Sequence, residues 1–499
     1  MSGEGASTAQ TGVFGLDDIL GGGLPRNHIY VIEGTPGAGK TTLGLQFLLA
    51  GKAAGETCLY VSLSETRQEI QAVADSHGWI LDGIEIHELV PSQDLTAEAD
   101  TTLFHPAEIE LGETTGSILA EIERVDPSRL VIDSLSEVRL LSQNSLRYRR
   151  QIVGLKQFLA SRRCTALLLN DGSEEGDQHL QTVSHGIVRL EHVAPLYGAD
   201  RRRLRVTKLR AVRFREGFHD FRIETGGIVV FPRLIAAEHQ SEFVRETVSS
   251  GLAGLDALLG GGLNRGTTAL ITGPAGTGKS AIVAQYSAAA AGRGENVVMF
   301  TFDEGPGTLF ARTEALGIPL RRHVEGGRVR VKQIDPAELS PGEFTHQVRR
   351  SLDEEGARMV IIDSLSGYYS AMPEERLLSV QLHELFSFLR QRGSVVLLTL
   401  PQHGFVGSEV EANIDVSYLA DTVVLLRYFE IAGEVRKAIS VIKKRSGRHE
   451  SFIRQLAMDG QGLRIGPPLR DFQGVLTGLP TYSGSSGELL RDREVPSDR

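Results

Sequence analysis

The stretch GTPGAGKT at residues 34–41 decides the fold of this chain, and a matching stretch, GPAGTGKS, stands at residues 273–280. Both fit the pattern G-x-x-x-x-G-K-[S/T], and each follows a short apolar run and opens a helical pattern. In that context the glycines let several backbone N–H groups point at phosphate oxygens, and the start of the helix adds its dipole. One match could be a glycine-rich turn, but two in the same context predict two phosphate-binding loops.

These loops belong to a longer internal repeat. GLDDILGGGL at residues 15–24 returns as GLDALLGGGL at residues 254–263, and both pairs of blocks are separated by 239 positions. Later blocks, such as IDSLS at residues 132–136 and 362–366, keep the same order at a slightly smaller offset. A period of this length indicates two tandem domains rather than a solenoid.

We expect four parts along the chain. The first domain covers residues 12–236, and the second covers residues 247–475. A polar linker at residues 237–250 joins them and overlaps the start of the second domain. The tail at residues 478–499 is rich in Gly, Ser, Pro and charged residues, so we expect it to be flexible.

Each repeat alternates apolar runs with helical patterns. The first contains IYVIEG, TCLYVSL, RLVIDSL and TALLLN, and the second repeats the order with TALITG, NVVMFTF, MVIIDSL and SVVLLTL. Nearly continuous Val, Ile and Leu runs between helices predict an α/β fold, with a mostly parallel sheet flanked by helices in each repeat. Ligands of such sheets bind at the carboxyl ends of the strands.

The composition narrows the class of protein. The 499 residues are 41% hydrophobic and 23% charged, which is typical of folded globular chains. The net charge of −10 argues against nucleic acid or anionic membranes as partners. Residues 1–10 show no signal-peptide pattern, and no apolar run approaches the roughly 20 residues that a membrane span needs. Cys58 and Cys164 both lie in apolar runs. We therefore expect reduced core cysteines and a cytoplasmic protein.

The two loops predict the residues that hold ATP and Mg²⁺. Lys40 and Lys279 would reach the β- and γ-phosphates, and the hydroxyls of Thr41 and Ser280 would bind Mg²⁺. The predicted nucleotide-binding residues are Gly34, Thr35, Pro36, Gly37, Ala38, Gly39, Lys40, Thr41 and Thr42 in the first repeat and Gly273, Pro274, Ala275, Gly276, Thr277, Gly278, Lys279, Ser280 and Ala281 in the second.

Acidic residues follow two further strands of each repeat. Asp133 and Asp363 end apolar runs directly before a serine, where a carboxylate can hold Mg²⁺ through water or cap the next helix. Glu65 and Glu304 follow the strand after each loop helix, with Asp303 beside Glu304. A carboxylate there could orient or deprotonate a water near the γ-phosphate, although a solvated loop acid would give the same pattern.

Basic pairs lie late in each repeat, at Lys208 and Arg210 and at Lys443 and Arg445. Two cations separated by one residue project from the same side of a strand. They could form a solvated edge, or they could reach a γ-phosphate bound to a neighbouring subunit. The spacing alone leaves both interpretations open.

The blocks FGLDDILGGGLPR, GTPGAGKTT, IDSLS and ISVIKKR together resemble those of the KaiC-type ATPases of the RecA/DnaB superfamily. The resemblance runs from about residue 12 to residue 481, and residues 417–445 are especially specific. It implies two tandem RecA-like P-loop NTPase domains in a double-ring homohexamer with ATP bound between protomers. It also implies ATP hydrolysis in both tiers and autophosphorylation in the second.

The resemblance also assigns roles to single residues. The P-loops and the strand-end aspartates match the family in full, and the four basic residues match its finger residues. The paired glutamates of the family are half kept, as Ser64-Glu65 in the first repeat and Asp303-Glu304 in the second. If the first member is the base, the first repeat hydrolyses poorly and the second uses the shorter Asp303.

The phosphoacceptor pair of the family is Ser followed by Thr, and here it is Ser417 followed by Tyr418. The resemblance makes Ser417 the candidate phosphoacceptor, with a plain loop serine as the alternative. Tyr418 is longer than threonine, so we do not expect a two-site phosphorylation cycle or a timekeeping role. The tail after Thr481 departs from the family, so we expect no clock regulator to bind there.

The sequence therefore predicts an ATP-binding and ATP-hydrolysing signalling protein with serine/threonine autokinase activity in the second repeat. One alternative is a RecA-like DNA-dependent motor, in which the arginine-rich run at residues 201–205 contacts phosphates; a solvated hairpin is the simpler interpretation of that run. Another is a nucleotide-gated scaffold without catalysis, which Ser64 favours. We expect the chain to associate with itself and with signalling proteins that the sequence does not identify, but not with nucleic acid or a membrane.

Overall fold

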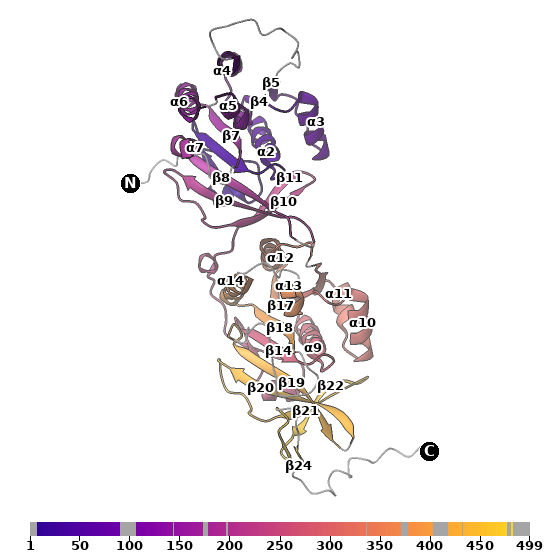
Figure 1. Cartoon of the computed structure of the whole chain (residues 1–499). Helices are drawn as coiled ribbons and strands as arrows, with labels where there is room; N and C mark the ends of the chain where they lie inside the picture. Colours follow the sequence, from indigo (N-terminus) through magenta and orange to yellow (C-terminus); the bar gives the residue numbers. More distant parts are fainter. Residues whose placement is uncertain are drawn as a thin grey trace. The chain divides into compact units, whose positions relative to one another are not determined.

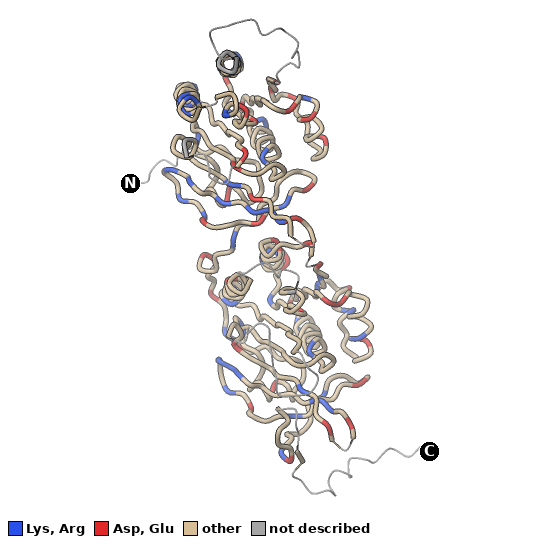
Figure 2. The backbone as a smooth tube through the Cα atoms, viewed as in Figure 1, with Lys and Arg blue, Asp and Glu red and all other residues tan. Residues whose placement is uncertain are grey.

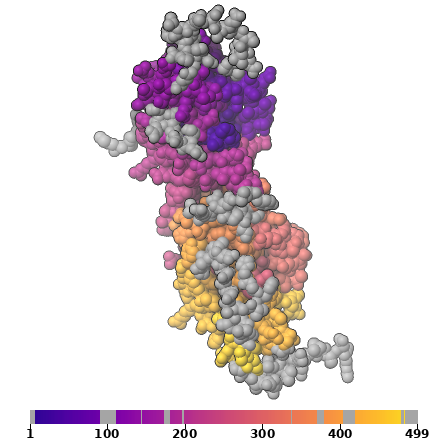
Figure 3. All heavy atoms as spheres, viewed as in Figure 1, coloured from indigo at the N-terminus to yellow at the C-terminus, as the bar shows by residue number. Residues whose placement is uncertain are grey.

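The chain divides into two compact units, Met1–Arg233 and Leu234–Arg499 (Figure 1). Each unit contains one large sheet with helices on both faces, so each repeat of the sequence forms one α/β domain. Figure 3 draws in grey the residues that are not described. The computed structural model describes residues 7–89, 106–142, 144–172, 178–195, 198–335, 337–370, 378–402, 418–431, 433–476 and 481–482.

The sheet of the first unit has nine strands within the described residues, in the order β11-β10-β9-β8-β3-β7-β6-β4-β5. Neighbouring strands run parallel from β8 to β5 and antiparallel from β8 to β11. The strands are β3 (Ile29–Gly34), β4 (Cys58–Ser62), β5 (Glu85–Glu88), β6 (Arg129–Asp133), β7 (Thr165–Asp171), β8 (Gly186–Val193), β9 (Arg201–Leu209), β10 (His219–Glu224) and β11 (Gly227–Phe231).

Side chains of the central strands alternate between two apolar faces. Tyr30 and Ile32 of β3 pack in one core with α2 and α3, whereas Ile29 and Val31 pack in another with α4, α5 and α6. Because both faces are buried, the strand is apolar at successive positions, as the sequence predicts. The helices of this unit are α1 (Leu16–Ile19), α2 (Lys40–Ala53), α3 (Arg67–Ser76), α4 (Pro106–Val125), α5 (Leu135–Ser142), α6 (Ser145–Ser161) and α7 (Gln178–Val183).

The second unit repeats this topology, with the described strands in the order β16-β15-β17-β18-β14-β19-β20-β21-β22. Strands β16 to β19 run parallel, and β19 to β22 run antiparallel. The strands are β14 (Thr268–Gly273), β15 (Asn296–Thr301), β16 (Val329–Gln333), β17 (Ala357–Asp363), β18 (Val395–Pro401), β19 (Thr422–Ile431), β20 (Glu434–Lys444), β21 (Arg454–Asp459) and β22 (Gly462–Pro468). The helices are α8 (Ala253–Leu258), α9 (Lys279–Gly292), α10 (Pro306–Ala315), α11 (Leu320–Glu325), α12 (Pro341–Asp353), α13 (Leu365–Ser370) and α14 (Leu378–Gln391).

The predicted fold class, two tandem α/β domains with mostly parallel sheets, is confirmed. Both cysteines are buried and free, as expected. Each sheet also carries three antiparallel strands at one edge, which the apolar runs did not specify. Within the described residues, we found no helix with the length and apolar character that crossing a membrane requires.

The expected linker contains more regular structure than its polar sequence suggests. Leu234 and Ala236 are buried in the core of the second unit, and a 3-10 turn, η1 (Ala236–His239), packs on α14. Sequence patterning did not predict this structure, because the apolar residues of the segment follow neither helical nor strand periodicity. The remaining short strands are β1 (Thr8–Ala9), β2 (Leu24–Pro25), β12 (Thr247–Val248), β13 (Leu263–Asn264), β23 (Phe472–Gln473) and β24 (Thr481–Tyr482).

Candidate nucleotide-binding sites

Each P-loop joins a central strand to the helix that follows, β3 to α2 in the first unit and β14 to α9 in the second. Gly37 and Gly39 have φ values of 78° and 98°, and Gly276 and Gly278 have 76° and 109°, a left-handed conformation that favours glycine. Gly39 and Gly278 are the N-caps of the two helices, and no side chain of the described residues caps either one. The first-turn amides can therefore bind an anion, which the helix dipole also favours.

The P-loop lysines are buried and turned back onto their own loops. Lys40 Nζ donates to the carbonyl oxygens of Gly34 and Thr35 at 2.9 and 3.2 Å. Lys279 Nζ donates to the two equivalent carbonyls at 2.8 Å each. Burial lowers the pKa of Lys279 to about 8, and the nearby Asp363 carboxylate offsets part of that shift. A triphosphate would replace weak carbonyl acceptors with anionic ones.

The predicted metal ligands meet at the carboxyl ends of the strands. Thr41 Oγ1 donates to Asp133 Oδ2 at 2.8 Å, and Ser280 Oγ donates to Asp363 Oδ1 at 3.1 Å. These contacts direct both carboxylates to the P-loop rather than to the helix that follows them. The other donors to the two carboxylates are Tyr60 in the first unit and Thr399 in the second.

This arrangement fits Mg²⁺. Magnesium ions bound with nucleotide take few protein ligands, because waters and phosphate oxygens complete the octahedron. Each unit offers one hydroxyl and one carboxylate in contact, which is such a donor set. No group of three or more His, Cys, Asp or Glu side chains suited to a metal occurs in the part of the chain that the structure describes, so nothing there resembles a site built from protein ligands alone.

The candidate acid of the first unit is influenced by the charges of the P-loop lysine and the strand-end aspartate. Glu65 is half-buried, and Glu65 Oε2 is buried without a hydrogen-bond partner in the described part of the chain. Burial and the negative charge of Asp133 raise the pKa of Glu65, whereas the ammonium of Lys40 lowers it. The carboxylate therefore lies within electrostatic range of both the lysine and the predicted metal ligand. An unpaired oxygen at this position could accept a proton from a water molecule.

In the second unit the two acids at this strand end differ in their contacts. Glu304 accepts two hydrogen bonds from Arg312 of α10, at 2.5 and 3.2 Å. Asp303 accepts one from Ser364 Oγ at 2.5 Å, and Ser364 follows Asp363 directly. Asp303 thus lies beside the predicted metal ligand, while Glu304, expected near the γ-phosphate, is held in an ion pair with a helix.

The two finger lysines occupy the same structural feature in both units. Lys208 pairs with Ile187 where the β8–β9 register shifts, and Lys443 pairs with Val423 where the β19–β20 register shifts. A bulge re-aims the side chains beside it. The arginines, in contrast, lie one residue beyond their strands, so strand alternation does not orient them.

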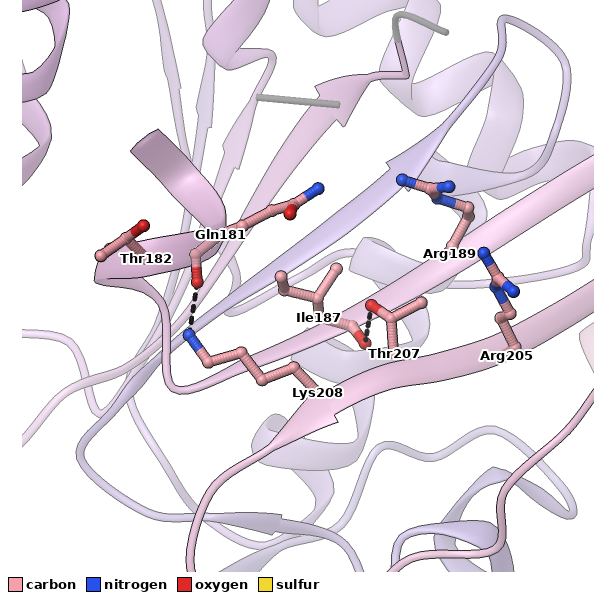
Figure 4. A pocket seen from close by; sticks show the side chains of 7 residues that line it. All are labelled: Gln181, Thr182, Ile187, Arg189, Arg205, Thr207 and Lys208. Carbon is pink, nitrogen blue, oxygen red and sulfur yellow. Dashed lines mark hydrogen bonds between the residues drawn. The ribbon is translucent and has the colours of Figure 1, made fainter. Parts of the chain in front are cut away.

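Both residues of the first basic pair donate to backbone carbonyls of one segment, residues 181–184. Lys208 Nζ donates to the carbonyl oxygens of Gln181 and Ser184, and Arg210 Nη2 donates to that of Thr182 at 3.1 Å. Lys208 also lines a groove of about 720 Å³ on the sheet (Figure 4). The remaining lining residues are Gln181, Thr182, Ile187, Arg189, Arg205 and Thr207.

Arg189 and Arg205 make this groove basic. They stand opposite each other on β8 and β9, and Figure 4 shows both side chains at the same end of the groove. Glu33, the residue before the P-loop, is almost fully buried and forms an ion pair with Arg189 at 2.9 Å. Glu33 and Arg189 are not among the sequence-predicted site residues, because only the pairing of β3 with β8 brings them together.

The arginine-rich run at residues 201–205 lies in β9 itself, not in the connection before it. Arg203 forms an ion pair with Glu191 at 3.3 Å, and Arg202 lies 3.9 Å from Asp200. Figure 2 shows acidic and basic residues interspersed over both units. Part of this run is therefore neutralised locally.

In the second unit Arg445 Nη2 donates to the carbonyl oxygen of Tyr418 at 3.2 Å and lies 3.7 Å from Asp421. This contact corresponds to that of Arg210 in the first unit. Ser417, the candidate phosphoacceptor, lies outside the described residues. Tyr418, its neighbour, has an exposed side chain.

Two further residues at the P-loops were missed. Asp171 Oδ1 lies 2.8 Å from Lys40 Nζ, and the hydroxyl of Tyr428 donates to the carbonyl oxygen of Ala275 at 3.0 Å. Asp171 follows TALLLN directly, so a charged residue that ends an apolar strand was the available signal. Tyr428 had no such signal, because it lies in the middle of β19.

The sequence profile of the KaiC ATPase family matches residues 9–235 and 248–470. The chain belongs to the KaiC ATPase family. Both matched stretches contain one P-loop, one strand-end aspartate and one basic pair, so the two KaiC repeats coincide with the two candidate sites.

Named relatives of the KaiC family resemble the chain over nearly its whole length. The circadian clock protein KaiC3 of Synechocystis sp. is 27% identical over 496 residues, which cover 97% of this chain and 96% of that protein. The circadian clock oscillator protein KaiC of Synechococcus elongatus is 28% identical over 484 residues, covering 95% and 91%. That of Thermosynechococcus vestitus is 28% identical over 479 residues, covering 94% and 91%.

Proposed function

We propose that this KaiC-family protein binds and hydrolyses ATP at both P-loops and signals through its nucleotide state. The observation that carries the proposal is the same constellation in both units: an uncapped helix start, a buried lysine, and a hydroxyl in contact with a strand-end carboxylate. A phosphate-binding loop with only one of these features would support binding alone. All three together support phosphoryl transfer to water.

The residues divide the chemistry between them. Backbone amides of the P-loops hold the β- and γ-phosphates, and Lys40 and Lys279 neutralise their charge. Thr41 with Asp133, and Ser280 with Asp363, would hold Mg²⁺, which neutralises charge that develops on the phosphate oxygens. Glu65 in the first unit and Asp303 in the second would accept the proton of the attacking water.

Each pocket is completed, in this proposal, by a second copy of the chain in a homohexamer. The basic pairs support it, because Lys208 and Lys443 occupy equivalent bulges and Lys208 opens onto a basic groove. Cations delivered from a neighbour would stabilise charge on the γ-phosphate. Autophosphorylation on Ser417 is the second part of the proposal, and it rests on the family resemblance.

The test is the full-length variant that carries both Lys40→Ala and Lys279→Ala. Phosphate release should fall at least tenfold, because both ammonium groups are lost from the triphosphate sites. Lys52→Ala is the control, since Lys52 lies on α2 but bonds to the carbonyl oxygen of Ile80. Undiminished release in the double variant would refute the proposal. Incubation with γ-labelled ATP tests the kinase part. Absence of label on the chain would leave an ATPase only, and label on a residue distant from Ser417 would refute Ser417 as the acceptor.

A further inference from the structure

The two P-loop lysines differ in one contact. Lys40 Nζ has three acceptors, two loop carbonyls and Asp171 Oδ1 at 2.8 Å, so each hydrogen of its ammonium can be satisfied before nucleotide arrives. Lys279 has the two equivalent carbonyls, and within the described part of the second unit it forms no ion pair with a carboxylate. The lysine of the first site thus already has an internal anion as a partner.

The backbone around this contact is the same in both units. Asp171 pairs with Gly34 across β3 and β7, and Pro401 pairs with Gly273 across β14 and β18. The next amide donates to the glycine carbonyl in both, at 3.1 Å in the first unit and 3.0 Å in the second. The side chain at this position, and not the backbone, is therefore what distinguishes the contacts of the two lysines.

Asp171 is well placed to hold the lysine. Its own amide donates to Ser136 Oγ at 3.1 Å, which ties the strand end to the helix after Asp133. Its side chain is 46% exposed, whereas that of Lys40 is 8% exposed. The ion pair is partly screened by water, so its effect on binding is modest.

We infer that Asp171 is a positioning residue that competes with the triphosphate for Lys40 and makes the first site bind ATP more weakly than the second. This inference rests on the proposed function. Binding of ATP at the first site must break the Lys40–Asp171 pair and bring the phosphates near an uncompensated carboxylate. At the second site Lys279 has no ion pair with a described carboxylate to break, so more of the attraction appears as affinity.

The test measures the Kd of a fluorescent ATP analogue with Mg²⁺ on the full-length chain. Lys279→Ala silences the second site, and in that background Asp171→Asn should tighten binding at the first site about two- to fivefold. Asp171→Glu keeps the charge and should stay near the parent value. Raising the salt concentration should shrink the difference between Asp171→Asn and its parent, because the effect is electrostatic.

The reverse substitution gives an independent readout. In a Lys40→Ala background, Pro401→Asp should weaken binding at the second site about two- to fivefold, while Pro401→Asn should not. Unchanged or weaker binding in Asp171→Asn, or equal effects of Asp and Asn at position 401, would overturn the inference. A parent chain that binds no nucleotide at either site would instead refute the proposed function, so the two failures are distinguishable.

Discussion

At the scale of single residues, the two repeats present different acids to the strand-end aspartate. Glu65 occupies the second position of the acid pair and lies within range of Asp133 and Lys40, whereas Asp303 occupies the first position and bonds to Ser364. Glu304 forms an ion pair with Arg312 instead of contacting a residue next to the strand-end aspartate. The sequence alone could not assign different contacts to Asp303 and Glu304, because the two acids are neighbours after the same strand.

A substitution pair separates Asp303 from Glu304. In the Lys40→Ala background, Asp303→Asn should lower phosphate release at the second site at least tenfold, because the group beside the metal ligand loses its charge. Glu304→Gln should lower it less than about threefold, because Glu304 is engaged with α10. Steady-state phosphate release measures both. The opposite ranking would return the role of base to Glu304.

The first site should show a pH dependence set by Glu65. Burial and Asp133 raise its pKa, so the carboxyl keeps its proton at a higher pH than a free glutamate does. A base acts only when ionised, and phosphate release in the Lys279→Ala background should therefore fall as the pH drops through that raised value. A profile between about pH 5 and pH 8 measures this. Glu65→Gln should be slow and flat across the range; an identical slope in that variant would contradict the assignment.

At the scale of elements, the ion pair of Glu33 and Arg189 links β3 to β8, and no equivalent pair exists in the described second unit. The corresponding positions are Thr272 and Leu425, which carry no charge. Glu33 Oε1 lacks a hydrogen-bond partner among the described groups. The positive charge paired with this buried carboxylate is the guanidinium of Arg189. Arg189, which lines the basic groove, thus also neutralises a buried charge in β3, the strand before the first P-loop.

Removing one partner should cost more than removing both. Arg189→Met leaves Glu33 charged and buried, and we expect a loss of about 2 to 3 kcal/mol in the free energy of unfolding. Adding Glu33→Gln should bring the stability to within about 1 kcal/mol of the parent chain. Urea unfolding followed by the fluorescence of Trp79, the single tryptophan of the chain, reports the first unit. Equal losses in the single and double variants would argue against this coupling.

At the scale of the whole molecule, the proposal needs more than one chain. Lys208, Arg210 and Arg445 donate to carbonyl oxygens of their own unit, and both basic pairs lie at the antiparallel side of their sheets. Their place at equivalent bulges is explained if a neighbouring protomer brings its nucleotide to them.

Assembly and hydrolysis should therefore fail together. In the Lys279→Ala background, Lys208→Ala with Arg210→Ala should lower phosphate release at least tenfold, because only the first site remains active. In the Lys40→Ala background, Lys443→Ala with Arg445→Ala should do the same for the second site. Both pairs of substitutions should also reduce ATP-dependent association. Light scattering with and without ATP measures the mass. Arg436→Ala on β20 is the control, because Arg436 pairs with Glu434 on the same strand. A parent chain that stays monomeric with ATP would refute the homohexamer.

Local chemistry in the sequence determined the fold class, the duplication and the two P-loops. Glycine spacing, the lysine after it and the apolar strand before it are contiguous, so they can be read without knowing any distant contact. The strand-end aspartates were predictable for the same reason, because the carboxyl ends of parallel strands share one edge of a sheet.

Only the tertiary structure decided that Asp303 bonds to Ser364 while Glu304 pairs with Arg312. It alone also decided that Asp171 contacts Lys40, and that Arg189 and Arg205 share a groove with Lys208. These contacts depend on strand order, on bulges and on rotamers, and they join residues as distant in the chain as Lys40 and Asp171. Side-chain direction at a strand end is set by the neighbours that pack around it, and those neighbours come from other parts of the sequence.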